Sequence, residues 1–76
     1  MIGVEVTQLV RDEGSVVLFR GQELDENGVD YKGSVTFACD HRPAYAIAQA
    51  LEEGEPDIYV ELDEWQIISR IPNTEE

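Results

Sequence analysis

Residues 57–63 constrain the fold more than any other stretch of this chain. Apolar and polar side chains alternate there, so an extended backbone would send Ile58, Val60 and Leu62 to one face and the residues between them to the other. A period of two residues is typical of a strand that has one face on a hydrophobic core. We therefore predict a strand at residues 57–63 whose outer face carries carboxylates.

Further carboxylates lie on both sides of this predicted strand. We call the predicted surface the acidic ridge, and we expect its charges to steer a basic partner while one aromatic and one aliphatic side chain anchor it. The candidate partner-binding residues are Glu53, Glu55, Asp57, Tyr59, Glu61, Asp63, Glu64 and Ile68. Outward charges on a strand also discourage edge-to-edge aggregation, so this simpler interpretation stays open.

The first half of the chain predicts three more strands. These span residues 2–10, 16–20 and 31–39, with a turn at 11–15 and a polar loop at 21–30. In that loop the pair Asn27-Gly28 suits a tight turn, because glycine tolerates positive φ. The run Val16-Val17-Leu18-Phe19 has no alternation, which predicts either burial on both faces or a partner that covers the outer face.

One helix and a closing hairpin complete the prediction. Asp40 is placed to cap a helix that runs to about Glu53, with an apolar stripe at i, i+3, i+4 and i+7 and Gly54 at its end. We expect Asp63-Glu64 to form a two-residue turn into a strand at 65–71. That hairpin would pair Leu62 with Trp65, and Asp57 with Arg70 as a surface salt bridge. Residues 73–76 are predicted to be an acidic tail.

These elements predict an α+β fold in one domain, residues 1–76. The order β-β-β-α-β-β is most simply a single antiparallel sheet of about five strands with one helix packed on its apolar face. No apolar run approaches the roughly 18 residues that span a bilayer, and the N-terminus lacks the order of a secretory signal. The single cysteine, Cys39, cannot form an internal disulfide. We therefore expect a cytoplasmic protein.

Net charge is the outlying property of the composition. Seventeen Asp and Glu against five Lys and Arg give a formal net charge of -12 at pH 7. This charge disfavours nucleic acid and anionic membranes as direct partners, and it favours a basic protein surface. Outward strand residues recur at about 6.6 Å, near twice the phosphate step of about 3.4 Å along one DNA strand, so the ridge could mimic DNA. Solubility alone is the competing explanation for the charge.

The sequence carries no catalytic motif and no cofactor motif. Cys39 and His41 could form a nucleophile–base pair, but only Asp40 is at hand to orient the base, and no oxyanion site accompanies them. Asp25, Asn27 and Asp30 surround Gly28 as in a calcium loop, yet the distant glutamate and flanking helices of an EF-hand are missing. We expect neither an enzyme nor a bound metal or cofactor.

The overall pattern resembles a known group of small proteins. An opening hairpin VEVTQLVRDEGSVVLF, one alanine-rich helix AYAIAQALEEG and a closing strand pair ending in Ile71-Pro72, on a small acidic chain, resemble the acidic anti-CRISPR proteins of phages and other mobile elements. The resemblance implies a non-enzymatic inhibitor in a bacterial host. It would occupy the DNA-binding or PAM-binding surface of a type I CRISPR Cascade subunit without a cofactor.

A second hypothesis belongs to a different class. The chain could be a structural or assembly module that pairs through an exposed strand or an apolar face, including as a homodimer.

Overall fold

The α+β fold predicted from the sequence is confirmed. A computed structural model describes residues 1–72, and the acidic tail predicted at residues 73–76 lies outside the described residues. The elements are β1 (Ile2–Asp12), β2 (Val16–Leu24), β3 (Tyr31–Asp40), α1 (His41–Glu52), β4 (Tyr59–Leu62), the short 3-10 helix η1 (Glu64–Gln66) and β5 (Ile67–Pro72).

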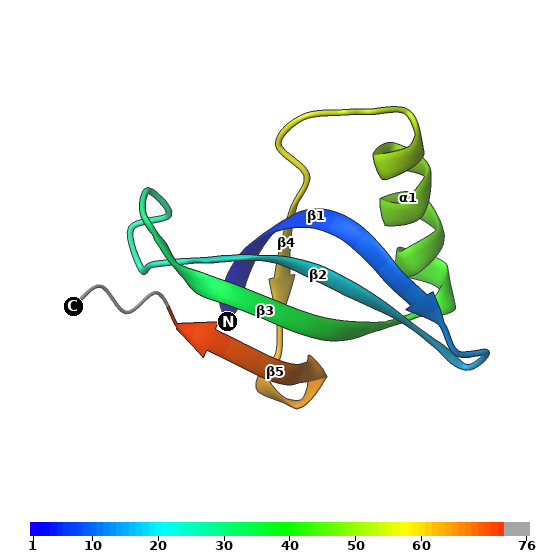
Figure 1. Cartoon of the computed structure of the whole chain (residues 1–76), viewed down its shortest axis with the longest axis horizontal. Coiled ribbons are helices and arrows are strands. Elements are labelled where there is room, and N and C mark those ends of the chain that lie inside the picture. Colours follow the sequence, from blue (N-terminus) through cyan, green and yellow to red (C-terminus); the bar gives the residue numbers. More distant parts are fainter. Residues whose placement is uncertain (73–76) are drawn as a thin grey trace.

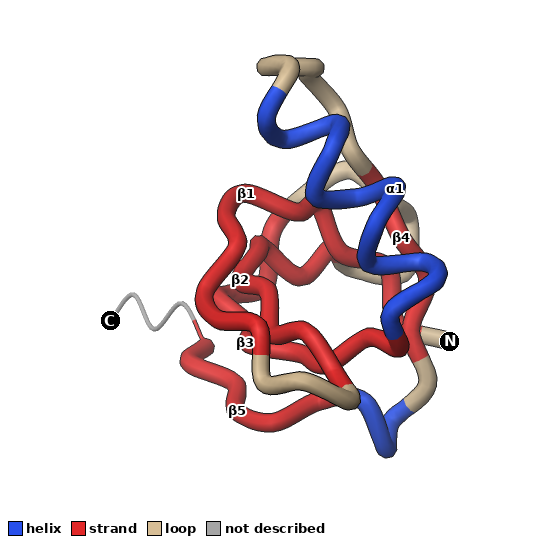
Figure 2. Tube along the Cα trace, turned by 90° about the vertical axis from the view of Figure 1, so that its right-hand side faces the viewer, coloured by secondary structure: helices blue, strands red, loops and turns tan. Residues whose placement is uncertain are grey.

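The five strands form one antiparallel sheet in the order β4-β1-β2-β3-β5. The sheet is strongly curved, and α1 lies along one side of it, as Figures 1 and 2 show. The two edge strands, β4 and β5, follow each other in the chain and are joined through η1. The last two strands are therefore separated across the sheet although they are neighbours in sequence.

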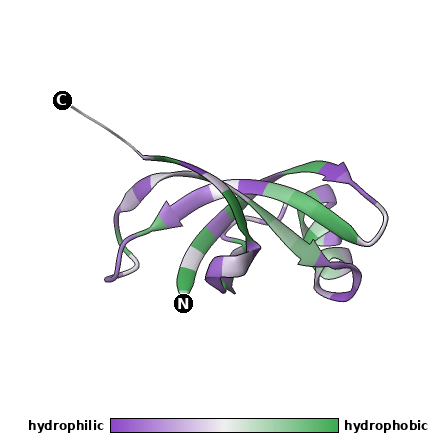
Figure 3. Cartoon of the chain, turned by 90° about the horizontal axis from the view of Figure 1, so that it is seen from below, coloured by the Kyte–Doolittle hydropathy of each residue, from purple (hydrophilic) through white to green (hydrophobic). Residues whose placement is uncertain are grey.

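The core lies between the inner face of the sheet and α1. Its centre is the cross-strand pair of Phe19 on β2 and Phe37 on β3, whose stacked rings have centroids 5.7 Å apart. The other buried members come from β1, β2, β3, α1 and β4: Val4, Val6, Val17, Val35, Cys39, Ala44, Ile47 and Leu62. Hydrophobic and hydrophilic residues alternate along the strands in Figure 3, which is the pattern of a sheet with one face on a core.

The helix ends as its sequence predicts. Gly54 adopts a φ of +74°, and its N–H donates to the carbonyl of Leu51 at 3.1 Å, while the N–H of Glu55 donates to the carbonyl of Ala50 at 3.1 Å. This pair of bonds is a Schellman motif, which satisfies carbonyls that the end of a helix would otherwise leave unpaired. Asp40 occupies the N-cap position, but its side chain makes no capping hydrogen bond.

Strand β2 is longer than the sequence predicts. Residues 21–24 belong to β2 rather than to the loop, because they pair with β1 on one side and β3 on the other. Gly21 resembles a turn residue in the sequence, but in the structure it lets two strands approach closely. A Cβ on Gly21 would clash with the backbone oxygen of Glu5 and lie 2.7 Å from Val4 Cγ1.

The loop that follows β2 therefore spans only residues 25–30. Its Asn27-Gly28 turn is confirmed, since Gly28 has a φ of +71° and its N–H donates to the carbonyl of Asp25 at 3.0 Å. The carboxylate of Asp25 accepts backbone N–H bonds from Asn27, Val29 and Asp30. These bonds, that from Val29 foremost, hold the pKa of Asp25 below its usual value.

The predicted hairpin of the last two strands is wrong. β4 pairs with β1, with Gly3 opposite Glu61, and β5 pairs with β3, so neither Leu62–Trp65 nor Asp57–Arg70 forms a pair. Asp63 starts η1 instead of a two-residue turn. The backbone N–H of Asp63 donates to Gln66 Oε1 at 3.0 Å, and the backbone N–H of Gln66 donates to the carbonyl of Asp63 at 3.0 Å. Reciprocal bonds of this kind begin a helical turn, which takes the chain away from β4.

The run at residues 16–19 is buried on both faces by the chain itself. Val17 and Phe19 belong to the core, and Leu18 on the opposite face is also buried. Because β2 lies between β1 and β3, it has no free edge for a partner strand. The second of the two explanations for this run, a partner on its outer face, is not needed.

Two glycine substitutions test the close approach of β1 and β2. Gly21→Ala should lower the free energy of unfolding by about 1–3 kcal/mol, because backbone cannot yield to the added methyl group. Gly3→Ala is the matched control, since its Cβ would meet only Leu24 Cδ1 at 3.9 Å, and it should cost less than about 0.5 kcal/mol. Urea denaturation followed by circular dichroism measures both, and equal stability of the two variants would contradict the register of β1 against β2.

Candidate functional site

The structure divides the predicted acidic ridge into three groups. Glu53 and Glu55 lie at the end of α1. Asp57, Tyr59 and Glu61 lie at β4 and are called the β4 group. The third group, Asp63, Glu64 and Ile68, lies at η1 and the start of β5. All eight residues are exposed, as expected. The hairpin predicted for the last two strands would also pair Tyr59 with Ile68 on its outer face. That pair is wrong, because β4 and β5 are opposite edges of the sheet.

The alternation that defined the β4 group is confirmed. Leu62 is buried and Ile58 and Val60 are partly buried against the core, while Tyr59 and Glu61 point outward. The strand itself is shorter than predicted, because Asp57 has a φ of +57° and cannot continue an extended backbone. Asp57 is therefore at the entrance of β4 rather than within it.

Two residues outside the predicted acidic ridge complete the β4 group. Glu5 on β1 lies directly opposite Tyr59, and the phenolic O–H of Tyr31 donates a hydrogen bond to Glu5 Oε1. The alternation of the first strand does place Glu5 on its outer face, but nothing in the sequence pairs that strand with β4. In the strand predicted at residues 31–39, the two-residue alternation places Tyr31 on the same inward face as Val35. Tyr31 is exposed because the pairing of β2 with β3 is irregular between Glu23 and Leu24.

Both tyrosines of this group have a pKa above the ordinary value. The pKa of Tyr31 rises to about 12, first through its hydrogen bond to Glu5 and then through burial and the charges of Glu5 and Asp57. Burial raises the pKa of Tyr59, with further contributions from Glu5 and Asp57. Deprotonating either phenol would place a second negative charge beside these carboxylates. The group therefore keeps two neutral phenols among carboxylates at physiological pH.

The third group contains an exposed tryptophan that the sequence predicts in the core. Trp65 is 70% exposed, and its indole N–H donates to Asp63 Oδ2 at 3.3 Å. Ile68, which is 57% exposed, lies at an irregularity in the pairing of β5 with β3, and Ile71 is also exposed. Large apolar side chains with such exposure are the usual anchors of protein contacts.

The carboxylates of all three groups lack a basic partner within the described chain. No Lys, Arg or His occurs between residues 43 and 69. Among residues 1–72 the ion pairs involve only three acidic residues, Asp12, Glu13 and Glu23. Arg70, predicted to pair with Asp57, instead donates to Glu23 at 3.1 Å. The negative charge of residues 53–64 is therefore directed to solvent.

The candidate thiol chemistry has no supporting geometry. Cys39 is buried, and burial raises the pKa of its thiol, with the charge of Asp40 adding to the effect. An activated cysteine needs the opposite shift. The His41 ring is directed to the β1–β2 turn, where Nε2 contacts the carbonyl of Gly14 and lies 3.8 Å from Asp12 Oδ1.

In the loop that resembles a calcium-binding loop in sequence, the carboxylate of Asp25 is occupied by backbone hydrogen bonds. Its Oδ1 accepts the backbone bonds from Asn27, Val29 and Asp30, which compete with a cation for that oxygen. Within residues 1–72, no three His, Cys, Asp or Glu side chains are grouped so that they could hold a metal ion. Over the same residues, no helix has the length and apolar character needed to cross a membrane.

Comparisons with known proteins identify no relative of this chain. Neither protein-family models, nor curated proteins, nor solved structures give a match. The resemblance to type I anti-CRISPR proteins stays a prediction.

A titration tests the geometry of the β4 group. Spectrophotometric titration at alkaline pH should show one tyrosine, Tyr31, ionising near pH 12, and Tyr31→Phe should remove that transition. Because the pKa is raised from its ordinary value of 10.0, the stabilisation is fully present below pH 10 and is lost as the pH rises toward 12. Glu5→Gln should lower the pKa of Tyr31, and an unchanged pKa would show that the two side chains are apart.

Proposed function

We propose that this chain is a non-enzymatic binding protein that docks on a positively charged surface of another protein. The observation that carries the proposal is the run of carboxylates at residues 53–64, exposed and without a basic partner among the described residues. Unscreened like charges on one small body cost stability, and a basic partner would relieve that repulsion. A solubilising charge distribution needs no such concentration in one segment.

Exposed aromatic and aliphatic side chains support a specific contact over a purely electrostatic one. Tyr59 is 55% exposed within the β4 group, and the exposed Trp65 and Ile68 follow Asp63 and Glu64 in the chain. Charge raises the rate of encounter, whereas buried aromatic anchors set the lifetime of a complex. The two anchor sets lie at opposite edges of the sheet, so each edge presents carboxylates together with its own apolar contact.

The partner class that best fits this surface is a nucleic-acid-binding protein. Grooves that bind a phosphate backbone are lined with Lys and Arg, and a carboxylate series competes for the same side chains. We propose an inhibitor of the anti-CRISPR type, acting in the bacterial cytoplasm, that blocks target DNA or PAM binding by a type I Cascade complex. Direct binding of DNA or RNA by the chain is disfavoured by its net charge of -12.

The assembly-module alternative has a narrower structural basis. A partner strand could pair only at a free edge, and β5 offers one on which Ile68 and Ile71 are exposed. Self-pairing would bring together two chains that each have a formal charge of -12, and the repulsion between them opposes a homodimer. Such association would resist salt and would fail when Ile71 is replaced by Lys.

Salt-dependent capture of a type I Cascade complex tests the proposal. The tagged chain should retain the complex at low salt and release it as salt rises, because screening weakens contacts between exposed charges. A variant with Glu55→Lys, Glu61→Lys and Glu64→Lys should lose binding by at least about a hundredfold, as loss of several charge contacts would give. Asp63 is left unchanged, since it holds Trp65 and η1.

A matched variant distinguishes the effect of charges at the proposed site from the effect of net charge alone. Glu13→Lys, Glu26→Lys and Asp30→Lys change the net charge by the same amount on exposed residues outside the three groups. This control should bind within a fewfold of the native chain. Equal loss in both variants would show that only total charge matters, and equal binding by both would refute the proposed site.

A further inference from the structure

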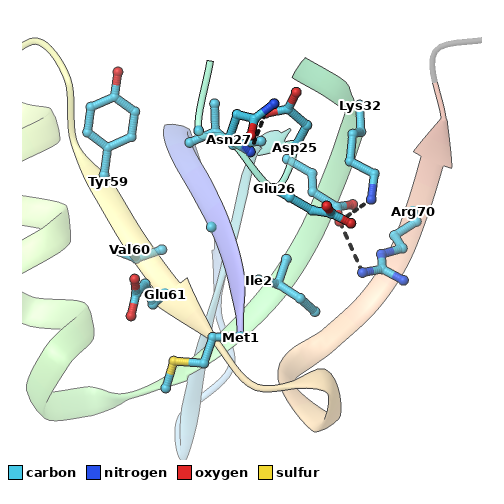
Figure 4. A pocket seen from close by; sticks show the side chains of 14 residues that line it. Met1, Ile2, Asp25, Glu26, Asn27, Lys32, Tyr59, Val60, Glu61 and Arg70 are labelled. Atoms are coloured by element: carbon cyan, nitrogen blue, oxygen red, sulfur yellow. Dashed lines mark hydrogen bonds and ion pairs between the residues drawn. The ribbon is translucent and has the colours of Figure 1, made fainter. Parts of the chain in front are cut away.

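The two edge strands leave a cavity between them. It has a volume of about 770 Å³ and is lined by residues of β1, β2, the loop 25–30, β3, β4 and β5. Figure 4 shows it between β4 and β5, with Ile2 and Val60 on one part of the lining and Lys32 and Arg70 on another. Its volume is in the range of small-molecule sites, which often lie in the mouths of curved or closed sheets.

A buried carboxylate with two cations lies in this cavity. Glu23 is only 7% exposed, and its Oε2 is 3.1 Å from Arg70 Nη2 and 3.9 Å from Lys32 Nζ. A carboxylate so deeply buried needs such partners, because burying an unpaired charge is costly. Two cations face this one carboxylate, so the cluster of Glu23, Lys32 and Arg70 taken by itself is positive, while Asp25, Glu26 and Glu61 place negative charge elsewhere on the lining. The guanidinium has five N–H donors and the ammonium three, which leaves donors for a second anion.

The rest of the lining restricts what that second anion could be. Ile2, Leu24 and Val60 provide apolar contacts, and Glu26 and Glu61 also belong to the lining. A free anion is repelled by a chain of formal charge -12, whereas a molecule with a carboxylate and an ammonium group is neutral overall. A zwitterion with an apolar side chain matches the positive, acidic and apolar parts of the cavity together.

We propose that this cavity binds a small zwitterion of the amino acid class, with its carboxylate on Arg70 and Lys32 and its apolar side chain against Ile2, Leu24 and Val60. The inference does not rest on the proposed contact with a basic protein, although Tyr59 and Glu61 belong to both surfaces. The ammonium group is balanced by the acidic residues of the same lining.

Ligand binding followed by NMR tests the proposal with three probes: L-leucine, L-leucinamide and N-acetyl-L-leucine. At near-physiological salt, leucine should shift the amide signals of Ile2, Glu23, Lys32 and Arg70. Leucinamide, which lacks the carboxylate, and N-acetyl-leucine, which lacks the ammonium group, should each bind at least about tenfold more weakly. No shift with leucine at about 10 mM, or equal binding of leucine and leucinamide, would overturn the proposal.

Two variants distinguish a ligand site from a purely structural ion cluster. Glu23→Gln removes the carboxylate that competes for the two cations, so leucine should bind several-fold more tightly. Glu23→Gln combined with Arg70→Gln should abolish binding while leaving no unpaired buried carboxylate to unfold the chain. Arg42→Gln, an exposed change on α1 outside the cavity, is the control and should leave the affinity unchanged. Weaker binding by Glu23→Gln would contradict the assigned role of Arg70 and Lys32.

Discussion

The pairing of β4 with β1 is the contact on which the rest of this structure depends. Val4, fully buried, lies in the register between Val60 on β4 and Glu23 on β2. The pairing buries Val60 against Val4 and Leu62 against Ile2, and burial of apolar side chains is worth more than any surface ion pair, so it decides where β4 goes. With β4 on β1, β5 is left to pair with β3, and the chain must cross from one edge to the other through η1.

Three features of functional interest follow from that one pairing. It brings Tyr59 opposite Glu5, which builds the group of phenols and carboxylates on the outer face. It frees Arg70 from Asp57 and places it on Glu23, which stabilises a carboxylate that the sequence predicts in a surface loop. It also separates β4 from β5, which leaves the cavity between them. The acidic segment is thereby presented in three groups instead of one continuous ridge.

Much of the fold could be predicted because burial leaves a periodic trace. Ile58, Val60 and Leu62 face the core as their alternation predicts, and Gly54 ends α1 through the positive φ that only glycine adopts readily. The same periodicity does not indicate which strand lies next to which. The predicted pairing of the last two strands was wrong for this reason. A two-residue period defines a face, whereas the neighbour depends on long-range packing.

The remaining errors arise from residues that admit two local interpretations. Asp63 with Gln66 three residues later suits the start of a helical turn, a pattern that is present in the sequence and outweighs the expected hairpin turn. Gly21 suggests a loop, but its missing side chain is needed for the approach of β1. Trp65 suggests core by its hydrophobicity, yet η1 leaves it on the surface beside Asp63. The exposure of the candidate carboxylates was predicted correctly because charged side chains are rarely buried without partners.

The most direct measurement of the central claim is a set of long-range NOEs on the labelled protein in solution. We expect interstrand NOEs from Gly3 to Glu61 and from Glu5 to Tyr59, together with NOEs from Thr36 to Ser69, because β4 and β5 lie on opposite edges. NOEs from Glu61 to Gln66 and from Val60 to Ile67, in place of these, would show a β4–β5 hairpin. That result would contradict the sheet order, the cavity and the grouping of the acidic residues at once.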